Sequence, residues 1–235
     1  MADDPMLTSA MVLAAGRGER MGALTEHMPK PLLPIGTETL IARQIRRLAA
    51  AGVRDIVVNT SYRALQLREY LGDGARFDVQ IRYSDEGEPP LETAGGIIRA
   101  LPLLGAEPFI VVNADVVSDF EFAQLRPPVK LGTLVLVPNP PHHANGDFGI
   151  RGDGTASAAA PLYTFAGISV MRPQLFAGRS DEWQKLRPIL DAAVAEHALD
   201  AMLHRGLWID VGTPERLLEA QRVLADESLE SPDKS

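Results

Sequence analysis

Residues 10–35 read AMVLAAGRGERMGALTEHMPKPLLPI, and we expect this stretch to decide the fold. An apolar run at residues 11–15 leads directly into Gly16-Arg17-Gly18. Such a run is typical of a buried strand that opens a loop lined by backbone groups. Glycines let backbone N–H groups approach an anion closely, as phosphate-binding loops require. The stretch therefore predicts a phosphate-binding loop after a first strand.

Three basic residues support this interpretation: Arg17, Arg20 and Lys30. Lys30 stands between Pro29 and Pro31, which restrict the backbone on both sides. A lysine held in this way provides a fixed positive charge for a phosphate group.

Two common nucleotide motifs do not fit the loop. The dinucleotide fingerprint needs a third glycine where Met21 stands, and an acidic residue at the end of a second strand about 20 residues further on. The ATPase P-loop needs Gly-Lys-Ser or Gly-Lys-Thr, which the chain lacks. A glycine turn without any ligand remains the alternative at this point.

Composition excludes several other classes of function. The 235 residues include 23 basic and 31 acidic side chains, a net charge of −8, which disfavours a nucleic-acid partner. The chain has no cysteine, so it forms no disulfide and has no thiolate metal site. No apolar run approaches the roughly 20 residues of a membrane span, and the acidic start does not resemble a signal peptide. We expect a cytoplasmic protein, a monomer or weak homodimer, with no membrane partner.

Helical and strand patterns alternate through the first half of the chain. We expect helices at residues 39–51, 64–71 and 95–104, and buried strands at residues 55–59, 80–84 and 109–113. Apolar strands separated by helices of this length form right-handed crossovers and a sheet covered on both faces. The expected fold class is α/β, a Rossmann-like mixed, mostly parallel sheet flanked by helices. Its ligands would bind beyond the carboxyl ends of the strands.

The second half is less regular. We expect strands at residues 133–137, 148–150, 164–171 and 208–211, a turn of small residues at 152–161, and helices at 186–197 and 214–224, the latter capped by Thr213. The whole chain is interpreted as one domain with halves at about 10–135 and 136–225. Residues 1–9 and 226–235 are expected to be polar segments outside the domain.

Two aspartates follow short apolar strands. Asp115 follows FIVVNA, and Asp210 lies in WIDVGTP before a glycine turn. Each alone fits a loop or helix-capping carboxylate. Together with a phosphate loop they fit magnesium, which takes one or two carboxylates besides phosphate oxygens and water.

LAAGRGERM and PKPLLPI together resemble the signature of the sugar-1-phosphate nucleotidyltransferases. The chain departs from the family's usual pattern at Glu19, Ala23 and Ala114. The resemblance implies attack of a sugar 1-phosphate on the α-phosphorus of a nucleoside triphosphate, with release of pyrophosphate. It assigns nucleotide binding to the first half and sugar binding to the second.

The resemblance also implies roles for individual residues. Catalysis falls to Arg20, Lys30, Asp115 and Asp210, with Mg²⁺ on the two aspartates. Nucleotide binding falls to Leu13, Ala14, Ala15, Gly16, Gly18, Arg20, Lys30, Thr93, Gly95, Gly96 and Asn113. Sugar binding falls to Asn113, Asp147 and Gly167.

Some of these residues also have structural interpretations. Residues 92–96 fit a plain helix N-terminus as well as a surface for a flat base, and Gly167 fits a close crossing of strands. Arg82 and Glu86 are expected to be surface charges. His142 and His143 are adjacent and have no third ligand at a recognisable spacing, so a zinc site is disfavoured.

Within the family, EGEPPLETAGGI, NPPHHANGDF, TFAGISVM and WIDVGTPERL look most like the short N-acetylmuramic acid 1-phosphate uridylyltransferases of bacterial cell-wall recycling. The substrates implied are UTP and N-acetylmuramic acid α-1-phosphate. The alternatives are a mannose-1-phosphate guanylyltransferase or another hexose-1-phosphate enzyme, a non-catalytic nucleotide-sensing domain, and an NAD-dependent oxidoreductase.

Overall fold

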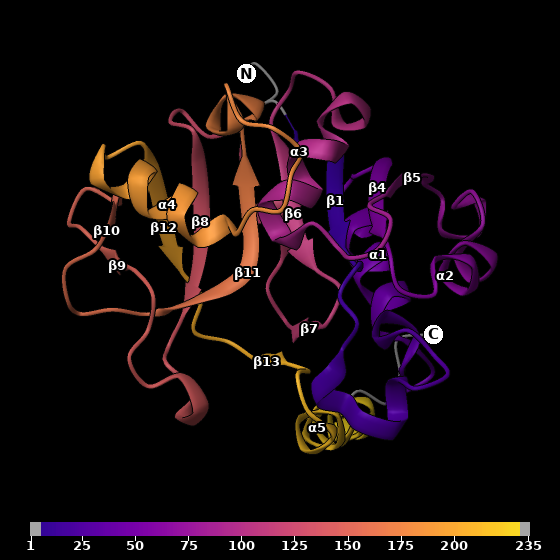
Figure 1. Cartoon of the computed structure of the whole chain (residues 1–235). Coiled ribbons are helices and arrows are strands. Elements are labelled where there is room, and N and C mark those ends of the chain that lie inside the picture. Colours follow the sequence, from indigo (N-terminus) through magenta and orange to yellow (C-terminus); the bar gives the residue numbers. More distant parts are fainter. Residues whose placement is uncertain (1–5, 231–235) are drawn as a thin grey trace.

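A seven-stranded mixed sheet forms the centre of the computed structural model, which describes residues 6–230 (Figure 1). Its strands lie in the order β12-β8-β11-β6-β1-β4-β5. Their bounds are β1 Ser9–Leu13, β4 Asp55–Thr60, β5 Gln80–Asp85, β6 Phe109–Asn113, β8 Gly132–Val137, β11 Thr164–Met171 and β12 Leu199–Leu203. Strand β11 runs antiparallel to both its neighbours, β6 and β8, and the other pairings are parallel. The predicted α/β class and mostly parallel mixed sheet are confirmed.

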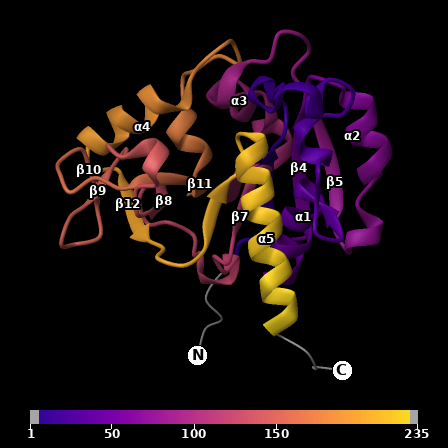
Figure 2. The same ribbon diagram turned by 90° about the horizontal axis from the view of Figure 1, so that it is seen from below.

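Helices cover both faces of this sheet (Figure 2). Helices α1 (Leu40–Ala50) and α2 (Ala64–Leu71) contribute to one buried apolar cluster, and α3 (Glu92–Leu104) and α4 (Leu186–Ala195) contribute to the other. Side chains of β1 alternate between them, because Ala10 and Val12 belong to the first cluster and Met11 to the second. Both faces being covered explains why the central strands are apolar throughout.

A third apolar cluster lies below the sheet in Figure 1, where α5 (Pro214–Glu230) packs beside the segment that follows the glycine loop. It also contains residues of β7 (Val116–Ser118) and β13 (Trp208–Asp210), which pair antiparallel. Thr213 caps α5, since its Oγ1 accepts a hydrogen bond from the Arg216 N–H at 3.4 Å. The β7–β13 pair and α5 therefore lie beneath β1 and β6 in Figure 1.

Short elements complete the chain. They are β2 Pro34–Ile35, β3 Glu38–Thr39, β9 Gly149–Ile150, β10 Ala156–Ser157, and the 3₁₀ helices Glu19–Thr25, Lys30–Leu32, Ala75–Phe77, Phe122–Gln124, Pro141–His143 and Pro173–Phe176. No helix within residues 6–230 combines the length and the apolarity needed to cross a lipid bilayer.

The structure differs from the elements predicted from the sequence in several places. Strands β7 and β12 were not expected, and β10 lies within the predicted turn at 152–161. The β12 sequence LDAML has weak strand propensity and is held by parallel pairing with β8. Helix α5 runs on to Glu230, where a tail was expected from residue 226, because Ala, Leu and Glu favour helix. Leu7 is buried in the core, although it falls in the expected polar leader, whereas residues 1–5 and 231–235 lie outside the described part.

Candidate active site

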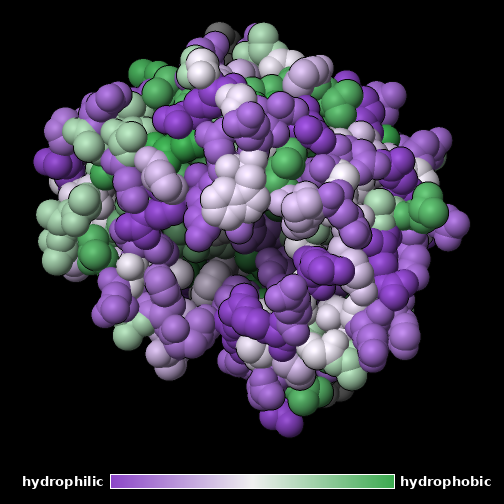
Figure 3. All heavy atoms as spheres, viewed as in Figure 1, coloured by the Kyte–Doolittle hydropathy of each residue, from purple (hydrophilic) through white to green (hydrophobic). Residues whose placement is uncertain are grey.

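A cavity of about 930 Å³ lies beyond the carboxyl ends of β1, β4 and β6, where the surface is hollowed (Figure 3). The glycine loop, the ends of these strands, the start of α3 and the turn before α5 surround it. Its lining comprises Leu13, Ala14, Ala15, Gly16, Arg17, Gly18, Glu19, Arg20, Lys30, Pro31, Asn59, Ser61, Tyr62, Glu86, Glu88, Pro89, Pro90, Glu92, Thr93, Asn113, Ala114, Asp115, Trp183 and Gly212. The structure thus brings most of the residues expected to bind nucleotide to one place.

The glycine loop packs tightly against the lysine segment. Gly18 has a φ of +68°, and a Cβ there would lie 2.9 Å from the Cβ of Lys30. Its carbonyl accepts a hydrogen bond from the Thr25 hydroxyl at 3.0 Å. Only glycine combines this left-handed backbone with so close a neighbour. Gly18 therefore sets the position of Lys30 relative to the loop.

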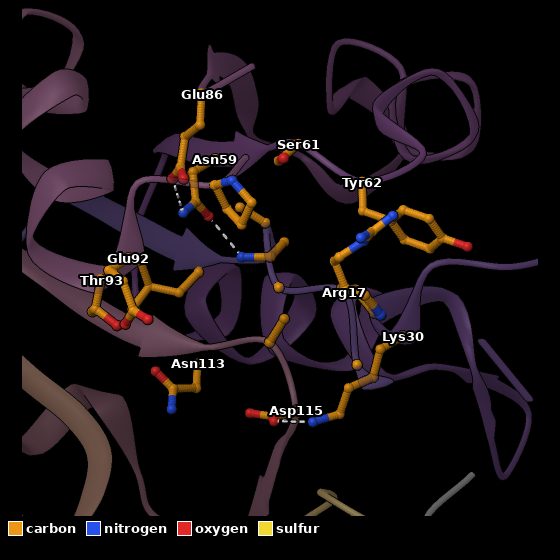
Figure 4. Close-up of a pocket in the computed structure, with 18 of the residues that line it drawn as sticks. Arg17, Lys30, Asn59, Ser61, Tyr62, Glu86, Glu92, Thr93, Asn113 and Asp115 are labelled. Carbon is orange, nitrogen blue, oxygen red and sulfur yellow. Dashed lines mark hydrogen bonds and ion pairs between the residues drawn. The ribbon is translucent and has the colours of Figure 1, made fainter. Parts of the chain in front are cut away.

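Lys30 reaches across the cavity and pairs with the carboxylate of Asp115 (Figure 4). The lysine side chain is 11% exposed and the aspartate 27%. The turn that holds Asp115 is supported from below by the buried amide of Gln44, which donates hydrogen bonds to the carbonyls of Asn113 and Val116. Both partners are thus fixed by their backbones at the floor of the cavity.

A buried polar network links the glycine loop to the next strand. The side-chain oxygen of Asn59 accepts a hydrogen bond from the Ala14 N–H at 2.6 Å, and its Nδ2 donates to Glu86 Oε1 at 2.7 Å. The other oxygen of Glu86 accepts from the Leu91 N–H at 2.8 Å. The expectation that Glu86 is a surface charge is wrong, because it is 5% exposed and fixes the loop that leads to α3. Arg82 is partly exposed and lies 3.8 Å from Asp55.

The glycines at the start of α3, Gly95 and Gly96, are packed tightly against neighbouring segments. A Cβ at Gly95 would lie 2.2 Å from the carbonyl oxygen of Glu182, and one at Gly96 would lie 2.2 Å from Glu86 Oε1. Neither glycine lines the cavity, whereas Glu92 and Thr93 do. These glycines therefore let the 180–185 segment and the Glu86 carboxylate approach the helix closely.

The backbone at Asp210 lies beside the backbone at Asp115. It is the register partner of Val116, and the Val211 N–H donates to the Asp115 carbonyl at 2.8 Å. Its carboxylate contacts the Arg216 guanidinium and, at 3.0 Å, His142 Nε2. Asp210 itself does not line the cavity, but the adjacent Gly212 does.

Two arginines converge on Gly212. A Cβ there would lie 2.3 Å from Arg216 Nη2 and 3.1 Å from Arg20 Nη2. Arg17 also lines the cavity, with its guanidinium 5.2 Å from the centre of the Tyr62 ring (Figure 4). With Lys30, these side chains surround one end of the cavity with positive charge, which suits a polyphosphate.

A second cavity of about 280 Å³ shares Leu13, Thr93 and Asn113 with the first. Its further lining is Val111, Asp147, Phe148, Phe165, Gly167, Leu186, Arg187 and Leu190. The residues expected to bind sugar, Asn113, Asp147 and Gly167, are therefore brought together in it. Gly167 has a φ of +69°, and a Cβ there would lie 2.6 Å from Asn113 Nδ2.

The donor set fits magnesium in part. Asp115 and Asp210 offer the hard oxygen ligands that magnesium prefers, on backbones that are directly hydrogen-bonded. No cluster of three His, Cys, Asp or Glu side chains able to hold a metal occurs in the described part of the chain. Phosphate oxygens and water would have to complete the coordination, as is usual where magnesium meets nucleotides.

Sequence reasoning missed several residues of the site. Asn59 ends the strand DIVVN as Asn113 ends FIVVN, so the same strand-end pattern could have found it. Arg187, Arg216 and Trp183 follow no such pattern. They reach the site only through contacts between distant segments, such as Arg216 with His142.

The chain is similar to several known proteins and belongs to the nucleotidyl transferase family. Residues 9–150 match the family model described as nucleotidyl transferase. An N-acetylmuramate alpha-1-phosphate uridylyltransferase from Neisseria meningitidis serogroup B is 43% identical over 222 residues, covering 90% of this chain and 96% of the relative. One of the same name from Caulobacter vibrioides is 33% identical and covers 92% and 97%. A mannose-1-phosphate guanyltransferase from Hypocrea jecorina is 31% identical, but the match covers only 62% of it.

Solved structures share the fold. A Bacillus anthracis protein crystallised with sucrose superposes with a TM-score of 0.80 at 18% identity, covering 93% of this chain and 95% of that one. HddC from Yersinia pseudotuberculosis, crystallised with GMP-PN, superposes with a TM-score of 0.75 at 20% identity, covering 93% and 100%. The whole sheet and its covering helices therefore follow a known architecture.

Proposed function

The chain belongs to the nucleotidyl transferase family, and from that premise we propose that it transfers a uridylyl group from UTP to N-acetylmuramic acid α-1-phosphate. The observation that carries this proposal is the match along nearly the whole length of two relatives named for that reaction. The two joined cavities support it, since one is large and cationic at one end and the other is small and mostly apolar. The products are UDP-N-acetylmuramic acid and pyrophosphate, and the role is cell-wall recycling in the cytoplasm.

The reaction needs no general base. The second pKa of a phosphate monoester is about 6, so the sugar phosphate is largely a dianion at neutral pH. One of its oxygens forms a bond to the α-phosphorus of UTP, and the bond from that phosphorus to the bridging β-oxygen breaks. Pyrophosphate leaves with both electrons of that bond. The protein must align two highly charged reactants and neutralise their charge.

The basic residues divide this task. Arg20 and the backbone N–H groups of Gly16 and Gly18 bind the β- and γ-phosphates that leave, and Lys30 binds the α-phosphate. Lys30 pairs with Asp115, which holds its ammonium group at the floor of the cavity. Arg216, near Arg20 at Gly212, adds positive charge at the same end.

Asp115 and Asp210 would hold Mg²⁺, which neutralises phosphate charge and polarises the α-phosphoryl oxygen when bound. Lys30 and Arg216 neutralise these carboxylates in the structure. In this proposal the half at about 10–135 binds the nucleotide and the half at about 136–225 binds the sugar. The buried Asn59 and Glu86 network keeps the glycine loop and the start of α3 at a fixed spacing for the nucleoside.

The test is pyrophosphate release by the purified protein with magnesium. UTP, GTP, CTP, dTTP and ATP are crossed against the 1-phosphates of N-acetylmuramic acid, N-acetylglucosamine, glucose and mannose. We expect a strong signal for UTP with the muramic sugar. A signal for GTP with mannose 1-phosphate would keep the mechanism and overturn the substrate, whereas silence with every pair would favour a non-catalytic nucleotide-sensing domain.

A further inference from the structure

We propose that Arg187 reads the lactyl carboxylate of the sugar and thereby selects N-acetylmuramic acid over N-acetylglucosamine. This inference rests on the proposed function. The two sugars differ in one feature, a lactyl ether on O3 that ends in a carboxylate. An enzyme that prefers the muramic sugar therefore needs a cation in the sugar cavity, away from the cations that bind phosphate.

Arg187 is the one basic side chain among the described residues that line the second cavity. The other lining residues are mostly apolar and include Val111, Phe165 and Leu190. A guanidinium attracts a carboxylate more strongly beside apolar walls than in open water, because the local dielectric is lower. The three basic residues that line the first cavity, Arg17, Arg20 and Lys30, do not reach the second.

Contacts with neighbouring side chains hold the Arg187 guanidinium in place. It lies 4.7 Å from the centre of the Phe148 ring, and its Nη1 donates to Asp147 Oδ1 at 2.9 Å. Nε donates to Asp191 Oδ1 at 2.7 Å. Nη2 also donates to the Asp147 carbonyl at 3.4 Å. A guanidinium has five N–H donors, so one hydrogen on Nη1 and one on Nη2 remain for a carboxylate after these contacts are made.

Asp147 positions Arg187 and has little capacity left for a direct sugar contact. Its Oδ2 accepts a hydrogen bond from the Phe165 N–H at 2.8 Å and lies 3.2 Å from His143 Nε2, while Oδ1 accepts from Arg187. Asp191 is different, since its side chain is 50% exposed and does not line the second cavity. It competes with an incoming carboxylate only weakly because water screens it.

The experiment compares two sugars rather than one. Wild type, Arg187→Gln and Arg187→Lys are assayed for kcat/KM with UTP and the 1-phosphates of N-acetylmuramic acid and N-acetylglucosamine. Calorimetric binding of UDP-N-acetylmuramic acid and UDP-N-acetylglucosamine gives the same comparison without turnover. We expect Arg187→Gln to weaken the muramic ligand by about 10- to 100-fold, the range of a hydrogen bond to a charged group, and to change the other ligand less than about threefold. Arg187→Lys should restore part of the preference.

Asp191→Asn is the matched control. It removes the negative charge beside Arg187 Nε and leaves the contact with Asp147 intact, so the preference for the muramic ligand should stay or rise about twofold. Equal losses for both sugars in Arg187→Gln would mean a purely structural role through Asp147. No loss for either sugar would mean that Arg187 makes no contact with the lactyl group. Either result overturns the assignment while wild-type turnover of the muramic substrate keeps the proposed function. A wild type that neither turns over nor binds the muramic ligands overturns both.

Discussion

The two halves of the molecule build their parts of the site in different ways. The first half places its residues directly after the parallel strands β1, β4 and β6, whose carboxyl ends meet at one edge of the sheet. The second half uses an antiparallel strand, short hairpins and a helix, and its site residues do not follow the ends of parallel strands. Arg187, for example, lies in α4 and contacts Asp147 from the loop before β9.

The two halves therefore differ in what holds their site residues in position. In the first half the backbone places the groups, as with Gly18 against Lys30, and buried side chains fix the loops. In the second half exposed ion pairs hold side chains in position, and the Arg187 side chain is itself 51% exposed. We therefore expect substitutions in the first half of the site to affect turnover and stability strongly, and those in the sugar cavity of the second half to affect substrate preference with small effects on stability.

The largest expected effect is that of Asp115→Asn. Turnover should fall at least about 100-fold, because charge stabilisation at the reacting phosphate is lost. The amide still accepts a hydrogen bond from Lys30, so the protein should remain folded. Turnover by stopped assay and circular dichroism of the folded state measure the two effects.

Asp119→Asn is the control for that change, since it removes the same charge from a carboxylate that bonds His204 outside the cavity. Its turnover should stay within about twofold of wild type. Near-full activity of Asp115→Asn would contradict its assignment as a magnesium ligand and the importance of the first half in catalysis.

A paired substitution of two asparagines compares stability in the halves directly. Asn59→Ala leaves the Ala14 N–H and a buried Glu86 oxygen without their partner, so unfolding free energy should fall by about 2–3 kcal/mol. Asn139 also makes hydrogen bonds, to Ala144, Leu162 and Thr164, but it is exposed. Asn139→Ala should therefore cost about 1 kcal/mol or less. Urea unfolding curves measure both, and equal losses would remove the distinction between the halves.

The same distinction explains how far the sequence predicted the molecule. Strand-end residues such as Asp115 could be predicted, because an apolar run fixes where a parallel strand ends and therefore which residue reaches the site. The burial of Glu86 could not, since it depends on Asn59 from one neighbouring strand and on Leu91 beyond the loop. Strand β12 was missed because its pairing with β8, rather than its composition, makes it a strand.

Local sequence was least informative where segments cross in the second half. Arg187 follows an exposed tryptophan and a lysine, and nothing in that stretch marks it as part of a cavity. Its place depends on Phe148 and Asp147 from the loop before β9. Side chains that reach a site through such tertiary contacts have no periodicity to reveal them.

Within the second half, His142 links the loop before β9 to Asp210, and this contact can be tested by itself. It lies on the 141–143 turn and contacts both Asp210 and Arg216. His142→Ala should lower turnover by roughly three- to tenfold, the loss of one partly exposed polar contact, with an unchanged unfolding midpoint. His27→Ala, at an exposed position, is the control and should match wild type. A loss as large as that of Asp115→Asn would mean that His142 takes part in catalysis itself instead of only supporting Asp210 and Arg216.

The smallest effect compares two strained residues at helix ends. Glu92 begins α3 at the cavity with a φ of +62°, and His197 follows α4 away from both cavities with a φ of +56°. Glycine relieves left-handed strain at either position but adds freedom to the unfolded chain, so each substitution should raise the unfolding free energy by about 0.5 kcal/mol. Strain kept beside a cavity suggests a use there, so Glu92→Gly should also raise the KM for UTP about two- to fivefold, whereas His197→Gly should leave it unchanged. A KM that is unaltered in both variants would show that the Glu92 backbone is strained by packing alone, as the His197 backbone is. Backbone strain would then not distinguish the two halves.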